Sequence, residues 1–213
     1  VLTVFIAYFV LAKATFKKVE GIFTEAASYL QQMPPKIELA ISTMEKALVY
    51  APHQYGVQSQ VDNQIGTLYF VQKQFNKALP YLERSLNFGH WMGGSMLGVI
   101  YYKKKNHEKM KATFQTVLKR AKKQGLVWNL YAYLLCQIGD RDQAQAILIE
   151  ALKKTKDDPK VKDALQALQN GKKIKMKAYK EQWYQFHLES PPKQHQQMQV
   201  GGKMSKAARR GRW

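Results

Sequence analysis

Cysteine and acidic residues are scarce in this chain of 213 residues. Cys136 is the sole cysteine, which excludes an internal disulfide framework and a metal site built from several thiolates. Acidic side chains number 15 against 34 Lys and Arg, which gives a formal net charge of +19. Such a field attracts polyanions, among them nucleic acid, anionic lipid headgroups and acidic protein surfaces.

The positive charge is unevenly distributed along the sequence. Residues 1–90 hold 8 basic and 6 acidic side chains, whereas residues 91–213 hold 26 basic and 9 acidic side chains. The excess therefore belongs to the second half of the chain. A polyanion contact and a merely solvated basic surface are both compatible with this pattern.

The sequence also lacks a constellation of catalytic or metal-binding residues. Its five histidines have no metal-ligand spacing: His53, His90, His107, His187 and His195. The glycine-rich stretch 93–98 lacks the ending of a phosphate-binding loop, and close helix packing explains it better. No motif ties a histidine or an acid to Cys136, which favours an ordinary free thiol. We therefore expect no enzyme activity, no cofactor and no metal.

An uncharged stretch opens the sequence, from Val1 to Ala12. It is shorter than the roughly 20 apolar residues of a membrane-spanning helix, but the chain begins at Val1 rather than at methionine, so we expect further residues upstream. On that basis residues 1–18 are interpreted as a hydrophobic N-terminal segment that forms a transmembrane helix. A signal peptide, with Ala12-Lys13-Ala14 as its cleavage site, and a buried helix of the domain remain alternatives.

If the segment is an anchor, its flanking charge predicts the orientation. Lys13, Lys17 and Lys18 follow the uncharged stretch, and positive flanks stay in the cytoplasm. The expectation is thus a membrane-anchored protein of the bacterial inner membrane, with its helical domain facing the cytoplasm.

Similar units recur after this segment. Three units share a small residue followed three positions later by a larger one: Gly66 and Tyr69, Gly98 and Tyr101, Ala132 and Leu135. Within each unit a second helix follows, and its corresponding positions are Ala78, Met110 and Ala144, at gaps of 32 and 34 residues. An earlier unit has a weaker pattern, with Pro34-Pro35 before Ala40 and Ala47.

This spacing resembles the tetratricopeptide repeat, a helix pair of about 34 residues. The resemblance covers residues 21–156 and implies an all-α solenoid of three to four helix pairs, with an N-terminal hydrophobic helix. Asp158-Pro159 predicts the start of a capping helix that ends at Asn170-Gly171, within a basic and aromatic extension at 157–189. Residues 190–213 have no core-forming pattern and are interpreted as a mobile basic tail.

In this family, peptides lie on the concave face formed by the first helix of each pair. Carried onto this chain, that face comprises Gln60, Asn63, Thr67 and Phe70, then Met92, Ser95, Val99, Tyr102 and Lys103, and then Leu126, Asn129, Tyr133 and Gln137. Asn63 and Asn129 can bond a peptide backbone, and aromatic side chains supply flat anchors. Packing of these aromatics on neighbouring helices is the alternative.

Two hypotheses about function follow. The first is a non-catalytic, membrane-anchored scaffold that binds a protein partner in the groove and helps to assemble a multiprotein complex. The alternative is a protein associated with RNA, DNA or anionic lipid through a basic face that comprises Lys104, Lys105, Lys119, Arg120, Lys122 and Lys123. The aromatic cluster of Trp183, Tyr184, Phe186 and Leu188 is expected to pack back on the last helices, and a surface-exposed docking motif is the alternative.

Overall fold

A computed structural model describes the backbone of residues 2–52 and 54–191 and the side chains of 13–52 and 54–191. Within these ranges the chain is helical and contains no strand. The α-helices are α1 (Leu2–Leu30), α2 (Ile37–Glu45), α3 (Val57–Val71), α4 (Phe75–Ser85), α5 (Trp91–Lys103), α6 (His107–Arg120), α7 (Gly125–Gln137), α8 (Arg141–Thr155), α9 (Pro159–Gln169) and α10 (Glu181–Tyr184). Two 3-10 helices accompany them, η1 (Lys46–Tyr50) and η2 (Met176–Tyr179).

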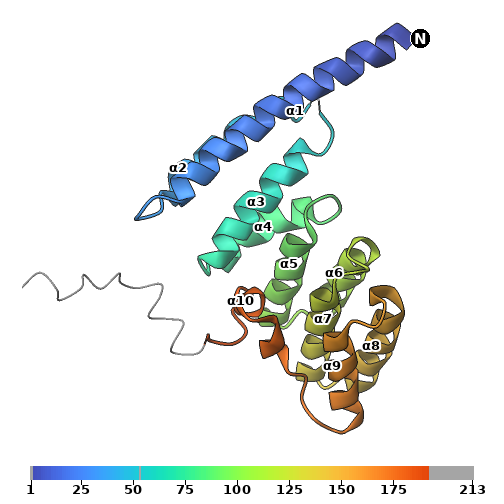
Figure 1. Ribbon diagram of the computed structural model, residues 1–213. Coiled ribbons are helices and arrows are strands. Elements are labelled where there is room, and N and C mark those ends of the chain that lie inside the picture. Colours follow the sequence, from blue (N-terminus) through green and yellow to red (C-terminus); the bar gives the residue numbers. More distant parts are fainter. Residues whose placement is uncertain (1, 53, 192–213) are drawn as a thin grey trace, which may run out of the picture.

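Successive helices pack as pairs along the chain. Helix α3 packs on α4, α5 on α6 and α7 on α8, while α1 packs on α2 (Figure 1). Helix α5 also touches both helices of the preceding pair, and α9 covers α7 and α8. This arrangement agrees with the predicted all-α helical repeat, in which each pair buries its apolar surface against the next.

Small residues permit the close approach within each pair. A Cβ placed on Gly66 would lie 2.7 Å from the side chain of Leu82, and one on Gly98 would lie 2.5 Å from the ring of Phe114. The third small residue, Ala132, is fully buried in α7. The recurring small position of the sequence is therefore the place where the two helices of a pair meet.

Side-chain caps fix where several of the later helices begin. Asn106 accepts a hydrogen bond from the backbone N–H of Lys109 at the start of α6, and Asp140 does the same for α8. At α9, Asp158 accepts from the N–H of Lys160 at 2.8 Å, and Pro159 takes the first helical position. These contacts satisfy backbone donors that a helix leaves unpaired at its N-terminus.

The expectation of a membrane-anchored protein of the bacterial inner membrane is wrong. Among the residues that the structure describes, none of the helices combines the length and the apolar character needed for a membrane span. The uncharged stretch forms the first part of α1, and the same helix continues through Lys13, Lys17 and Lys18 to Leu30. Val19 and Ala26 of this helix are buried in the core of the domain. The predicted boundary at residue 18 therefore falls inside one continuous helix.

Candidate interaction surface

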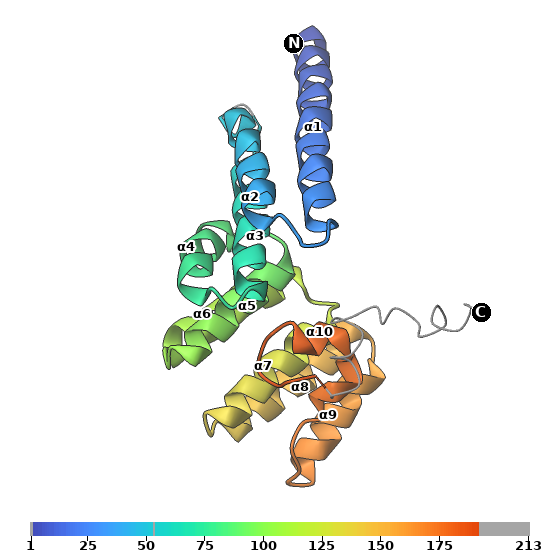
Figure 2. The ribbon, with the colours of Figure 1, turned by 90° about the vertical axis from the view of Figure 1, so that its left-hand side faces the viewer.

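The chain returns across the helix pairs after α9. Residues 174–189, here named the C-terminal segment, contain η2 and α10, and Figure 2 shows α10 lying beside α7. Trp183 and Phe186 of this segment are fully buried. The predicted tail begins at its end, and residues 192–213 lie outside the described part of the chain.

One end of the C-terminal segment is held by α7. Asn129 donates hydrogen bonds from Nδ2 to the main-chain oxygen of Lys160 and to the hydroxyl of Tyr179, each at 3.0 Å. The ring of Tyr133 meets the indole of Trp183 edge-on, with 5.0 Å between the centroids. Burial is the main cause that raises the pKa of Tyr179, so the phenol stays protonated.

The other end reaches α3, α4 and α5. Lys103 donates a hydrogen bond from Nζ to the main-chain oxygen of His187 at 2.9 Å. The imidazole Nε2 of His187 lies 3.1 Å from the main-chain oxygen of Val71, and its ring packs against Phe70 and Phe75. Burial, with smaller contributions from nearby lysines, lowers the pKa of His187. The imidazole is thus neutral near neutral pH.

Four of the predicted groove residues therefore contact the C-terminal segment: Phe70, Lys103, Asn129 and Tyr133. Other predicted groove residues are buried among the helices: Asn63, Ser95, Val99 and Leu126. Thr67, Met92 and Tyr102 are half-buried, and Gln60 and Gln137 are exposed. The predicted groove residues lie on α3, α5 and α7, and the family pattern gave no sign that residues 174–189 contact several of them.

The aromatic cluster at the C-terminus carried the signal that was missed. We expected it to pack on the last helices, and Trp183 does contact α7. His187, which was assigned no role, extends the contact to α3, 116 positions earlier in the sequence. The sequence shows a basic stretch followed by aromatic residues, but it does not show that this segment reaches as far as α3.

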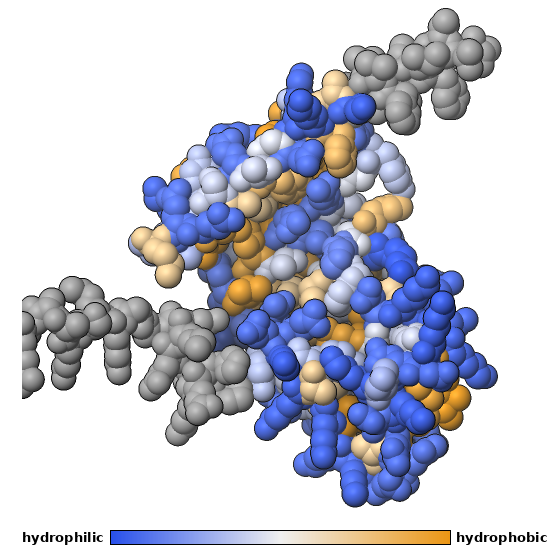
Figure 3. Space-filling view, viewed as in Figure 1, coloured by the Kyte–Doolittle hydropathy of each residue, from blue (hydrophilic) through white to orange (hydrophobic). Residues whose placement is uncertain are grey.

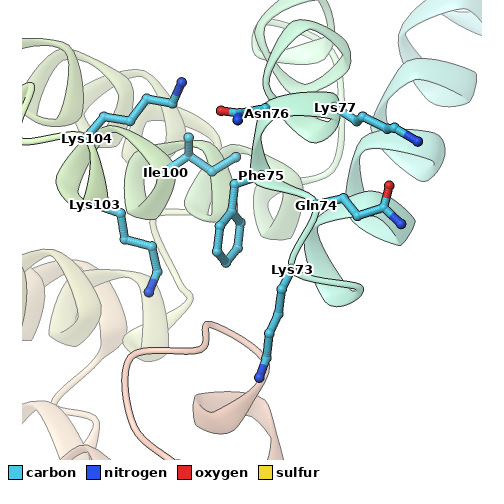
Figure 4. Close-up of a pocket in the computed structure, with 8 residues that line it drawn as sticks. All are labelled: Lys73, Gln74, Phe75, Asn76, Lys77, Ile100, Lys103 and Lys104. Atoms are coloured by element: carbon cyan, nitrogen blue, oxygen red, sulfur yellow. The ribbon is translucent and has the colours of Figure 1, made fainter.

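A lysine-rich cavity of about 380 Å³ lies where α4 begins and α5 ends (Figure 4). Four lysines line it, Lys73, Lys77, Lys103 and Lys104, and no acidic residue of the described chain joins them in the lining. Phe75 lies at its centre, with its ring centroid 5.3 Å from Nζ of Lys103. Burial, and to a smaller extent Lys73, lowers the pKa of Lys103. The local charge is therefore uncompensated by neighbouring carboxylates.

The predicted basic face is divided by the structure. Lys104 and Lys105 follow α5, whereas Lys119, Lys122 and Lys123 lie at the far end of α6, roughly 20 Å away along a helix of 14 residues. Arg120 is engaged with the protein, because its guanidinium donates to the main-chain oxygens of Leu86 and Gly89. Figure 3 shows a mainly hydrophilic surface over α6–α9 on the face in view.

The chemistry of a nucleophile or a metal is not favoured by the geometry. Burial is the main cause that raises the pKa of the half-buried Cys136 thiol, which is opposite to the shift of an activated cysteine. Within the described residues no three side chains of the types that bind metals come together.

The fold and this surface define a helical-repeat protein. Residues 96–168, from α5 into α9, match the family model of the tetratricopeptide repeat. Proteins of this family generally mediate protein–protein interactions. No curated protein and no solved structure shows significant similarity to the chain.

Proposed function

We propose that the chain is a non-catalytic scaffold that binds a protein partner on the surface formed by the first helices of its pairs. The observation that supports this most directly is the C-terminal segment. It contacts α5 through the hydrogen bond from Lys103, α7 through the hydrogen bond from Asn129 and the edge-on ring of Tyr133, and α3 through the tilted ring of Phe70. These are the contacts by which a helical groove holds a peptide from another protein.

A photocrosslinking experiment tests the proposal. In two test variants a photoreactive residue replaces Gln60 or Gln137, which are exposed on α3 and α7. In the control variant it replaces Gln115, which is exposed on α6, the second helix of its pair. In the native cells, the first two positions should yield a crosslinked protein that excess untagged chain competes away. The matched Gln115 variant should not yield it. Equal crosslinking from all three positions, or none from any, would contradict the proposal.

A second candidate function is supported by the lysine-rich cavity. Lys73, Lys77 and Lys104 line it beside Lys103 and face no carboxylate in the lining. An association with a nucleic acid would place phosphates there and release counterions. Binding of a single-stranded oligonucleotide is measured over a range of salt concentrations. The slope of log binding constant against log salt concentration should become shallower by roughly 2 when these three lysines become Gln. An unchanged slope would remove this candidate.

A further inference from the structure

One end of the proposed binding surface remains open. The face of α3 that carries Phe70 at its C-terminal end, where His187 covers it, carries Gln60 and Asn63 two to three turns earlier. These two residues line a cavity of about 410 Å³ between α1, the loop before α3 and the loop after α4. The C-terminal segment does not contribute to its lining.

Exposed aromatic side chains surround this cavity. Tyr55 is 80% exposed, Phe88 is 59% exposed and Phe16 is 55% exposed, although all three belong to the lining. Tyr55 and Phe88 meet edge-on with 5.1 Å between their centroids. Aromatic surface of this extent is normally covered in a folded protein, and clustered exposure marks a contact site.

The cavity is neutral although the chain is strongly basic. Its lining, as far as the structure describes it, includes no Lys, Arg, Asp or Glu. His90 is the one titratable group of the lining besides Tyr55, and its pKa is lowered by burial and by Arg120. Arg120 itself is bonded to main-chain oxygens of the neighbouring loop. A charged occupant would therefore find no counterion here.

Two amide oxygens at the cavity have no hydrogen-bond partner within the described structure, Oδ1 of Asn63 and Oε1 of Gln54. Asn63 is only 6% exposed, and a Cβ on Gly89 would lie 2.7 Å from its oxygen. A buried acceptor without a donor is unfavourable, because it has lost its hydrogen bonds to water. An occupant with an N–H or O–H group satisfies such acceptors after a rotation of the amide side chains.

We propose that this cavity is the docking site for an uncharged partner segment that places an aromatic side chain bearing its own donor, Trp or Tyr, beside the Tyr55–Phe88 pair and donates hydrogen bonds to the amide oxygens of Asn63 and Gln54. The inference rests on the proposed function, since it assigns the partner's anchor to one end of the same surface. Aromatic anchors of this kind dominate interface energy because they combine a large apolar area with one polar group.

A titration of the full chain with short peptides tests the site without the partner. The probe is N-acetyl-Ser-Trp-Ser-amide, and the matched probes carry Ala or Asp in place of Trp. The Trp peptide should bind with a Kd on the order of 1 mM, at least about tenfold tighter than either matched peptide. The side-chain amide signals of Asn63 and Gln54 should shift with the same saturation.

Variants locate the binding. Tyr55→Ser together with Phe88→Ser should weaken the Trp peptide by about tenfold or more, and folding is preserved because both side chains are largely exposed. Val49→Ser removes another side chain that is 72% exposed but lies outside the lining, and it should leave the affinity unchanged. Equal binding of the Asp peptide, shifts confined to other residues, or full affinity in the double variant would overturn the inference. Such a failure would leave the crosslinking result, and with it the scaffold proposal, intact.

Discussion

The ammonium group of Lys103 bonds the main-chain oxygen of His187, which lies 84 positions further along the chain. A second long-range bond joins Asn129 to Tyr179. Together they fix the two ends of the C-terminal segment on different helix pairs. The segment is therefore an integral part of the domain, and its removal should disturb helices that are remote in the sequence.

Trp183 should carry much of this attachment. The side chain is fully buried against Tyr133, so Trp183→Ala leaves a large cavity and should lower the free energy of unfolding by about 3–5 kcal/mol. Urea denaturation followed by far-ultraviolet circular dichroism measures the change. The neighbouring exposed residue Gln182 provides the control, because Gln182→Ala should stay within about 0.5 kcal/mol of the parent. A similar loss for both variants would contradict the role of the indole.

The small residues of the helix pairs should not tolerate even one added methyl group. A Cβ on Gly98 would lie 2.5 Å from the ring of Phe114, and that ring is fully buried and stacked on Tyr131, which restricts its movement. Gly98→Ala should therefore destabilise the domain by about 1–3 kcal/mol.

The matched substitution Gly21→Ala is expected to stabilise the domain. Gly21 lies inside α1 with no heavy atom within 4 Å of its added Cβ. Gly21→Ala should raise the free energy of unfolding by about 0.5–1 kcal/mol, because Ala loses less backbone entropy in a helix. Thermal or urea unfolding of the two variants side by side measures both signs. A stabilising Gly98→Ala would refute close packing at that position.

The buried carboxylate of Asp62 should depend on its arginine partner. Arg84 donates to both of its oxygens, at 2.7 Å and 3.1 Å, and Gln58 adds a third bond. Arg84→Met leaves the buried carboxylate of Asp62 with Gln58 as its one remaining side-chain donor. The free energy of unfolding should therefore fall by about 2–3 kcal/mol.

The second ion pair serves as the comparison. Lys111 and Asp140 are separated by 2.8 Å and are both partly exposed. Lys111→Met should lower the free energy of unfolding by no more than about 1 kcal/mol, because water replaces the lost partner. If the two Met variants lose equal stability in urea, the burial of Asp62 does not control the strength of its pair.

Stability should decrease in mild acid through His187. Its pKa in the folded protein lies below the unfolded value of about 6.5, because burial, with smaller contributions from Lys73 and Lys103, outweighs the opposing hydrogen bond to Val71. The unfolded chain therefore binds the proton more readily, so the contribution is complete above about pH 6.5 and is lost as the pH falls through the folded pKa. Urea unfolding between about pH 7.5 and pH 5 should show a smaller decrease for His187→Gln than for the parent. Parallel curves would show that this imidazole is not the group responsible.

Features encoded within one helix pair were predictable from the sequence. The spacing of Gly66 and Gly98 marks the helix crossings because that packing is local and repeats. Asp158-Pro159 begins α9 because capping depends on adjacent residues. Local patterns of this kind determine where helices start and where pairs close.

Features that depend on distant parts of the chain were not predictable in the same way. Arg120 looked like one of several surface cations, but its guanidinium finds the main-chain oxygens of Leu86 and Gly89, more than 30 positions earlier. Similarly, the uncharged N-terminal stretch gave no indication that α1 continues unbroken past Lys13 and Lys18. The partner of a long, flexible or apolar side chain is decided by the assembled fold, which no local pattern contains.

The path of the C-terminal segment also changes how the array resists denaturation. Helical repeats that touch only their neighbours can melt from either end, one pair after another. Here a stretch near the end of the chain is fastened to α7 by Trp183 and to α3 by His187. Loss of any pair between these points also removes the attachment, which couples the pairs energetically. We therefore expect this linear stack of helix pairs to unfold in a single cooperative transition, as compact globular domains do.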